Sequence, residues 1–139
     1  MHSPSSLPAT IVRTHDTRLS TRNVLSHAAS NAIDAVAILD RQGLREDALL
    51  PTLPAPYLLT GLTVFMSHEP CLLCAMSLLH SRIASLFFIK RAPGGGGCGS
   101  VYSVHEDQGL NHRFDVWEWK ADGGASTGVG AGLDLLLDP

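Results

Sequence analysis

One histidine and two cysteines in this chain have the types and spacing of a zinc site. Cys71 and Cys74 lie three positions apart in a Pro-Cys-Leu-Leu-Cys run, so a helix would carry both sulfur atoms on one face. His27 lies 44 positions earlier, near the expected start of another helix. Backbone N–H groups at a helix N-terminus favour the thiolate, which is the form of cysteine that binds zinc. We therefore predict that His27, Cys71 and Cys74 hold one Zn²⁺ and leave a fourth position for water.

Ala29 stands where hydrolytic chemistry at such a site needs a carboxylate. The pattern His-x-Glu followed by Pro-Cys-x-x-Cys marks the zinc deaminases, in which the glutamate moves a proton from zinc-bound water to the substrate. Here the histidine remains and the glutamate is replaced by a methyl group. Glu69 precedes the second helix, and we interpret it as a residue that serves backbone geometry. The sequence therefore predicts a zinc-binding chain with no catalytic residue of its own.

The composition predicts one globular domain in a reducing compartment. The chain has 139 residues, of which 45% are hydrophobic, and these values fit a single packed core. Three cysteines, no secretory signal and no apolar run of about 18 residues favour a cytoplasmic and/or nuclear protein without a membrane segment. The formal charge of −3 argues against this chain alone providing a nucleic-acid surface.

The hydrophobic pattern predicts strands that alternate with helices. Short apolar runs over residues 63–67 and 85–89 predict buried strands, and residues 115–119 alternate like a last strand near a sheet edge. A helix is expected from Ser26, capped by Asn23 or Ser26 and ended by Gly43, and a second helix over residues 71–81. This order favours an α/β fold with a largely parallel sheet covered on both faces.

The remaining segments are predicted from their local composition. We expect a short strand over residues 10–13, a loop over 16–23, no regular element throughout the proline-rich stretch 44–56, and a flexible loop at glycines 94–97 with Cys98 as a free surface thiol. The predicted domain organisation is a mobile segment 1–9, a zinc domain 10–120 and a flexible Gly-rich tail 121–139. Within that tail, residues 133–137 are leucine-rich and are expected to dock on the core.

Several further segments are shared with one known family. They are Ala32-Ile33-Asp34-x-Val36-Ala37, Tyr57-Leu58-Leu59-Thr60-Gly61, Ser67-His68-Glu69-Pro70-Cys71-x-x-Cys74-Ala75-Met76-x-Leu78-x-His80-Ser81-Arg82-Ile83 and Gly109-Leu110-Asn111-His112-Arg113-Phe114-x-Val116. On these segments the chain resembles the non-catalytic subunit of the eukaryotic heterodimeric tRNA-specific adenosine deaminase. The resemblance covers about residues 27–119, and the Leu-Asn-His-Arg-Phe segment is its most specific part.

The resemblance implies a fold, a partner and a reaction. The fold would be the cytidine-deaminase-like, three-layer α/β/α structure with a mixed sheet. The partner would be a catalytic subunit that keeps its glutamate, and the heterodimer would convert the wobble adenosine of certain tRNAs to inosine. His27, Cys71 and Cys74 match the family's zinc ligands by position, and no catalytic acid carries over.

The chain departs from that family in four ways. The family fold begins with a helix and a strand before the segment that matches residues 10–24, and we recognise neither here. Members usually carry a separate N-terminal domain that helps to hold tRNA. The glycine-rich extension after Lys120 has no recognised counterpart, and Ala29 stands where the family often has valine.

Other interpretations of the same residues remain open. The chain is alternatively a nucleoside or base deaminase domain inactivated by a Glu-to-Ala substitution at position 29, or a zinc-stabilised interaction module unrelated to deamination. The fourth zinc ligand is alternatively Asp134, Asp138 or the terminal carboxylate instead of water. Contacts with a partner or RNA compete with plain structural roles at seven further positions, which are His80, Arg82, Asn111, His112, Arg113, Trp117 and Trp119.

Overall fold

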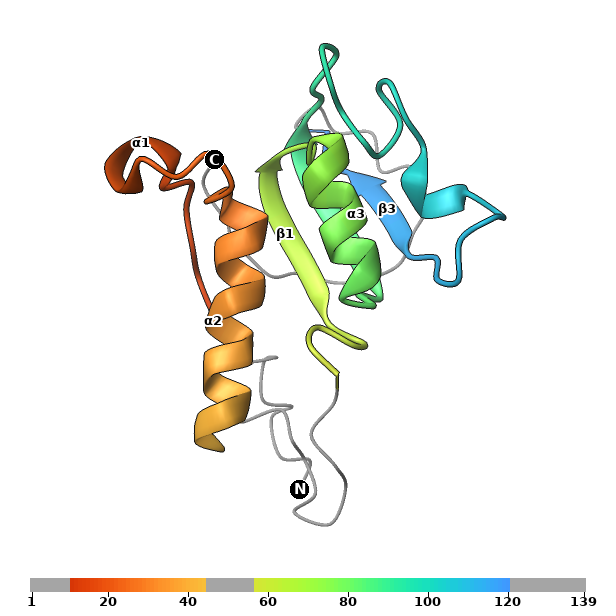
Figure 1. Ribbon diagram of the computed structural model, residues 1–139. Helices are drawn as coiled ribbons and strands as arrows, with labels where there is room; N and C mark the ends of the chain where they lie inside the picture. The colour runs from red at the N-terminus through yellow and green to blue at the C-terminus, as the bar shows by residue number, and fades with distance from the viewer. Residues whose placement is uncertain (1–10, 45–56, 121–139) are drawn as a thin grey trace, which may run out of the picture.

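The computed structural model of the chain describes residues 11–44 and 57–120 (Figure 1). In chain order its elements are α1 (Arg18–Thr21), α2 (Ala28–Gln42), β1 (Thr63–His68), α3 (Leu72–His80), β2 (Ser85–Lys90), the 3₁₀ helix η1 (Val104–Glu106) and β3 (Asp115–Glu118). No helix within these two ranges is long and apolar enough to cross a membrane. The predictions for residues 1–9, 45–56 and 121–139, including those for Asp134 and Asp138, lie outside the described residues.

The three described strands form one parallel sheet in the order β1-β2-β3. The register aligns Val64 with Leu86 and Leu86 with Val116, so side chains of one face stack across all three strands. The strands and α3 confirm the elements predicted from the apolar runs. All strand pairs among these residues are parallel, and the antiparallel part of a mixed sheet remains a prediction.

Helices α2 and α3 bury their apolar sides in one core on the first face of the sheet (Figure 1). Alanines and a valine recur at helical spacing along α2, and four of them are buried: Ala28, Ala29, Ala32 and Val36. Val36 meets Leu78 of α3 and Phe88 of β2 in a core cluster where each is at most 1% exposed. The second face of the sheet carries a row of stacked rings, because Phe65 stacks on Phe87 and Phe87 on Trp117.

Two predictions for the segment before α2 were wrong. Residues 11–13 form no strand, since Ile11 and Val12 pack against the core without pairing to the sheet. The expected loop over residues 16–23 contains the single turn α1, which follows an Asp16 carboxylate that accepts the backbone N–H of Arg18. The turn could not be recognised from its polar sequence, because hydrogen bonds and not buried apolar side chains stabilise it.

The start of α2 also differs from the prediction, whereas its end agrees. The N-cap is His27, and neither Asn23 nor Ser26 has that role. Asn23 Oδ1 instead accepts the N–H of Leu25, and the Ser26 carbonyl accepts that of Thr17. Gly43 ends the helix in the left-handed conformation with φ 65°, as its position predicted.

The second half of the glycine-rich loop after β2 is closely packed, contrary to the prediction of a flexible loop, whereas Gly94 and Gly95 have open space around them. Gly96 and Gly97 are buried, and a Cβ atom at either position would meet the side chains of Glu69 or Ala75. Cys98 is only 3% exposed and joins the core cluster, so the expectation of a surface thiol was wrong. Glycine is used here because backbone must approach side chains more closely than other residues allow.

Candidate metal centre

The two helices present their N-termini to each other, and the predicted ligands lie at those ends. His27 is the N-cap of α2 and Cys71 the N-cap of α3, both with extended backbone, and Cys74 lies in the first turn of α3. Neither N-cap side chain hydrogen-bonds to its own helix. An N-cap side chain normally accepts such a bond, so the imidazole and the thiol are free to face a common point.

The structure brings the three predicted site residues together. One donor atom each from His27, Cys71 and Cys74 lies within 4.8 Å of the others, and His27 Nδ1 is 3.9 Å from Cys71 Sγ. Cys74 is buried, whereas His27 and Cys71 are half-buried. One imidazole nitrogen and two sulfurs suit a tetrahedral metal such as zinc, for which ligand bonds are about 2.0–2.3 Å. The three residues are therefore a candidate ligand set for one ion.

The environment of Cys74 controls its protonation. Burial, followed by the neighbouring Cys71, raises the pKa of Cys74 to about 12, whereas the positive charge of Arg18 acts in the opposite direction. Without a metal, Cys74 is therefore a thiol at neutral pH. A bound cation and the two helix N-termini both favour its deprotonated form, so metal and proton compete for this sulfur.

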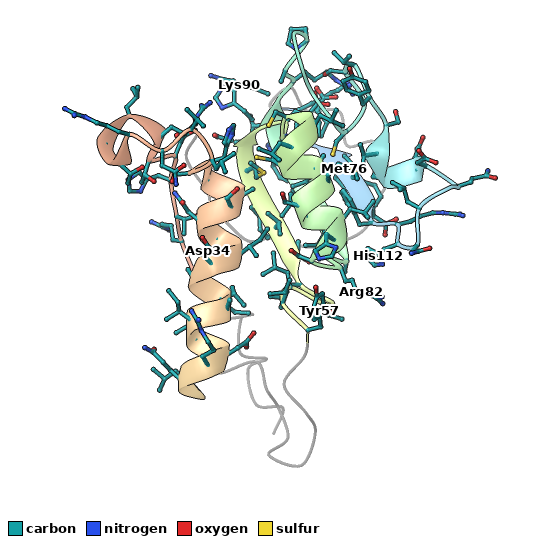
Figure 2. All side chains as sticks on the ribbon, viewed as in Figure 1. Asp34, Tyr57, Met76, Arg82, Lys90 and His112 are labelled. Carbon is teal, nitrogen blue, oxygen red and sulfur yellow. The ribbon has the colours of Figure 1, made fainter. Side chains whose placement is uncertain are left out.

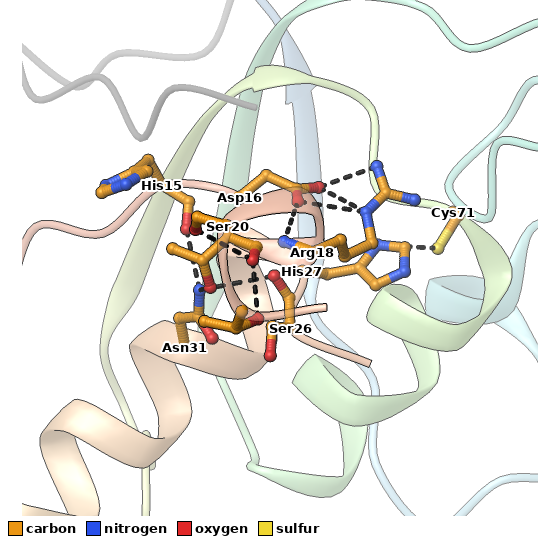
Figure 3. A network of polar contacts seen from close by, with 10 residues as sticks. His15, Asp16, Arg18, Ser20, Ser26, His27, Asn31 and Cys71 are labelled. Carbon is orange, nitrogen blue, oxygen red and sulfur yellow. Dashed lines mark hydrogen bonds and ion pairs between the residues drawn. The ribbon is translucent and has the colours of Figure 1, made fainter. Parts of the chain in front are cut away.

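An ion pair beside the cluster was not foreseen from the sequence. The Arg18 guanidinium lies near His27 and Cys71 in Figure 3, and its charge acts on both cysteines. Asp16 holds Arg18 in place, since its carboxylate oxygens accept Arg18 Nε at 2.8 and 3.1 Å. No spacing rule links residues 16–18 to position 71, so this contact follows only from the folded chain.

Asn31 fixes the loop that carries this ion pair (Figure 3). Its side-chain amide donates to the His15 carbonyl at 2.8 Å, to Thr17 Oγ1 at 2.9 Å and to the Ser26 carbonyl at 3.4 Å. Asn31 lies one helical turn after His27, whose carbonyl accepts the Asn31 backbone N–H. The sequence signal for this role was limited to a polar residue, Asn31, four positions after the predicted ligand His27.

No free carboxylate replaces the missing glutamate among the residues that the structure describes. Ala29 is 0% exposed and belongs to the same core cluster as Cys74. Glu69 is bound by the loop after β2, and Asp16 by Arg18. The cluster can thus hold a metal and a water, but it provides no group that would accept the water's proton and pass it on.

The other candidate residues lie away from the cluster or have structural partners. Tyr57, Arg82 and His112 lie at the C-terminal end of α3 in Figure 2, and Cys71 lies at the N-terminal end. His112 Nε2 lies 2.8 Å from the Ile83 carbonyl, which is the contact of a residue that fixes a loop. His80 Nε2 lies 3.2 Å from the hydroxyl of Tyr57.

Comparisons with known proteins agree with the fold. The tRNA-specific adenosine deaminase subunit tad3 of Schizosaccharomyces pombe is 43% identical over 101 residues, which cover 71% of this chain and 31% of that protein. The Saccharomyces cerevisiae subunit TAD3 is 29% identical over 99 residues, covering 68% of this chain and 29% of that protein. The chain is a homologue of the Tad3 subunits of tRNA-specific adenosine deaminases. It spans less than a third of these relatives' length.

Further comparisons extend this result to vertebrates and to a solved structure. The human "Probable inactive tRNA-specific adenosine deaminase-like protein 3" is 42% identical over 62 residues, covering 45% of this chain and 17% of that protein. A solved structure from a study of A-to-I editing by tRNA:A34 deaminases has a TM-score of 0.57 at 22% identity, covering 79% of this chain and 70% of that one. This likeness confirms the cytidine-deaminase-like α/β fold. No protein-family model matches the chain.

Proposed function

We propose that this chain is a zinc-binding, non-catalytic subunit that supports a catalytic deaminase in converting adenosine to inosine at the tRNA wobble position. The observation that carries the proposal is Ala29, a fully buried methyl group beside a His27, Cys71 and Cys74 cluster that keeps the geometry of a metal site. The names of the relatives, which include a "probable inactive" protein, support it. A complex of this kind, with zinc-bound thiolates, suits the reducing cytoplasm and/or nucleus.

Zinc at this site would polarise a bound water and lower its pKa. The protein's own part is to hold the ion through one nitrogen and two sulfurs at the ends of α2 and α3. General acid–base transfer contributes about 10²–10⁴ in rate, and Ala29 has no proton to exchange. We therefore assign the zinc a structural role, because it joins the two helix N-termini.

An exposed apolar strip on α3 is our candidate for contact with the catalytic partner. Leu72, Leu73 and Met76 are 38%, 47% and 40% exposed, and they lie together at helical spacing beside the metal cluster. Exposed apolar side chains clustered on one helix are a frequent feature of subunit interfaces. The partner would supply the catalytic glutamate. Because this chain has a net charge of −3, the partner would also supply much of the tRNA-binding surface.

Reconstitution with a catalytic subunit tests this function. The full chain is co-expressed with a glutamate-bearing catalytic deaminase subunit, and inosine formation at the wobble position of a tRNA transcript is measured with and without the chain. We expect inosine only when both chains are present, and we expect Cys71→Ser to reduce both zinc content and complex yield. Turnover by the isolated chain, or full activity of the catalytic subunit alone, would contradict the proposal.

A further inference from the structure

Glu69 is a buried carboxylate whose bonds all come from one loop. It is 4% exposed and lies between the end of β1 and the start of α3. Its two oxygens accept the backbone N–H groups of Ala92 at 3.1 Å, Cys98 at 3.0 Å and Ser100 at 3.0 Å, together with the Ser100 hydroxyl. The carboxylate is thus fully engaged and is no substitute for the missing catalytic acid.

The glycines of this loop make the close approach possible. A Cβ atom at Gly96 would collide with the Glu69 carboxyl group, and one at Gly97 would lie 2.6 Å from the Ala75 side chain and 3.2 Å from the Cys71 carbonyl. Backbone N–H groups that converge on an anion form the same arrangement that binds phosphate in glycine-rich loops. Here a carboxylate of the chain itself already fills that place.

The loop is also attached to the peptide that carries the metal ligand. The N–H of Gly97 donates to the Pro70 carbonyl at 2.8 Å, and Cys71 forms an isolated β-bridge with Gly96. Glu69 therefore lies two positions before Cys71 and also binds the loop whose Gly96 pairs with Cys71. Movement of the Glu69 carboxylate would therefore disturb the Gly97–Pro70 hydrogen bond and the Cys71–Gly96 bridge that hold the N-cap Cys71.

We propose that Glu69 is an internal anion that organises the loop of residues 92–100 and so positions Cys71 in the metal centre. The inference rests on the zinc site proposed above. Groups outside the ligand set that orient ligands in this way typically affect metal affinity by about 10–100-fold. Glu69 is a positioning residue, since it acts through the loop and through Cys71 and touches no substrate.

Cobalt substitution of the full chain tests this role directly. Co²⁺-loaded wild type is compared with Glu69→Gln, Glu69→Gly and the control Glu106→Gln, whose carboxylate is exposed. We expect both Glu69 variants to change the cobalt–thiolate charge-transfer spectrum and to release metal to a chelator about 10–100-fold faster. The control should match the wild type in both measurements.

Chemical rescue makes the test specific for an anion. Added acetate should slow metal release from Glu69→Gly, because it can occupy the vacated N–H groups, and should leave the wild type and Glu106→Gln unchanged. If the Glu69 variants do not fold, Gly96→Ala gives the same information. Its added Cβ displaces the Glu69 carboxylate from the loop, although Glu69 itself is unchanged. Folded variants with a wild-type spectrum and release rate would overturn the inference. A wild-type chain that binds no Co²⁺ or Zn²⁺ at His27, Cys71 and Cys74 would instead overturn the proposed function.

Discussion

At the scale of single residues, Ala29 and the three predicted ligands determine which chemistry the site can perform. That His27, Cys71 and Cys74 lie together was predictable from the sequence, because the Pro-Cys-x-x-Cys run and the earlier histidine both lie at helix starts. The sequence did not predict the ion pair of Asp16 and Arg18 or the role of Asn31, because these contacts depend on how a polar segment folds back. The burial of Cys98 was mispredicted for a related reason, because a glycine-rich sequence does not reveal what it packs against.

Restoring glutamate at position 29 should not create an active isolated chain. Ala29 is 0% exposed, so Ala29→Glu adds volume and a charge to a packed core. We expect the free energy of unfolding to fall by about 1–3 kcal/mol from overpacking alone and no deamination of a tRNA transcript. Denaturant titration and inosine analysis measure both effects.

Ala29→Gln is the matched control, because it adds the same volume without the charge. It separates the steric cost from the electrostatic cost in the same titration. A stable Ala29→Glu chain that forms inosine alone would favour the alternative of a deaminase inactivated by a single substitution.

Zinc binding should release the thiol proton of Cys74 near pH 7. Burial raises the pKa of the metal-free thiol to about 12, so this sulfur is protonated until the metal displaces the proton. The apparent zinc affinity should therefore fall as the pH is lowered. Calorimetric titrations in buffers with different ionisation enthalpies count the protons.

Cys98→Ala provides the control for proton release. Burial also raises the pKa of the Cys98 thiol to about 12, but Cys98 lies outside the ligand cluster. The variant should release as many protons as the wild type. A smaller count in Cys98→Ala, or none in the wild type, would contradict the assignment of the ligands.

At the scale of elements, apolar runs were reliable guides and polar segments were not. The strands β1, β2 and β3 and the helix α3 follow from continuous or alternating apolar residues, because burial dominates their stability. The turn α1 and the packed glycine loop are held by hydrogen bonds to Asp16 and Glu69, which no periodicity reveals. The position of His27 as the N-cap of α2 was also unforeseen, because its side chain makes no capping hydrogen bond and faces the cluster instead.

The two sides of α3 should respond differently to the same substitution. Leu78 is 0% exposed and Leu73 is 47% exposed. We expect Leu78→Ala to lower the free energy of unfolding by about 2–5 kcal/mol and Leu73→Ala to change it by less than about 1 kcal/mol. Leu73→Ala should instead weaken association with the catalytic partner, measured by co-purification. Equal losses of stability at the two positions would contradict this division of the helix.

At the scale of the whole molecule, the α/β fold class was predictable from the order of the apolar segments. Strands separated by helices indicated a parallel sheet, and the structure has one. The described residues supply the sheet and the helical layer of α2 and α3, with stacked rings of Phe65, Phe87 and Trp117 on the second face. A third layer and an antiparallel strand remain predictions.

The isolated chain should bind tRNA weakly. Its net charge of −3 gives little attraction to a polyanion, whereas a heterodimer can add basic surface from its partner. We expect affinity for a tRNA transcript at physiological salt to be at least roughly tenfold weaker for the chain than for the complex. Fluorescence anisotropy over a range of salt concentrations measures this, and comparable affinities with equal salt slopes would contradict it.

The position of His27 and Cys71 at two helix starts would make a bound metal a reversible cross-link. An ion that joins residues 27 and 71 closes a loop of 44 residues, for which a chain-entropy estimate gives about 4 kcal/mol of stabilisation. Because α2 packs mainly against α3, a chelator should release α2 before it disturbs the three strands. Hydrogen exchange after chelation would then rise first in the amides of Ala28–Gln42, and the availability of zinc in the cell would set how much of this helix is ordered.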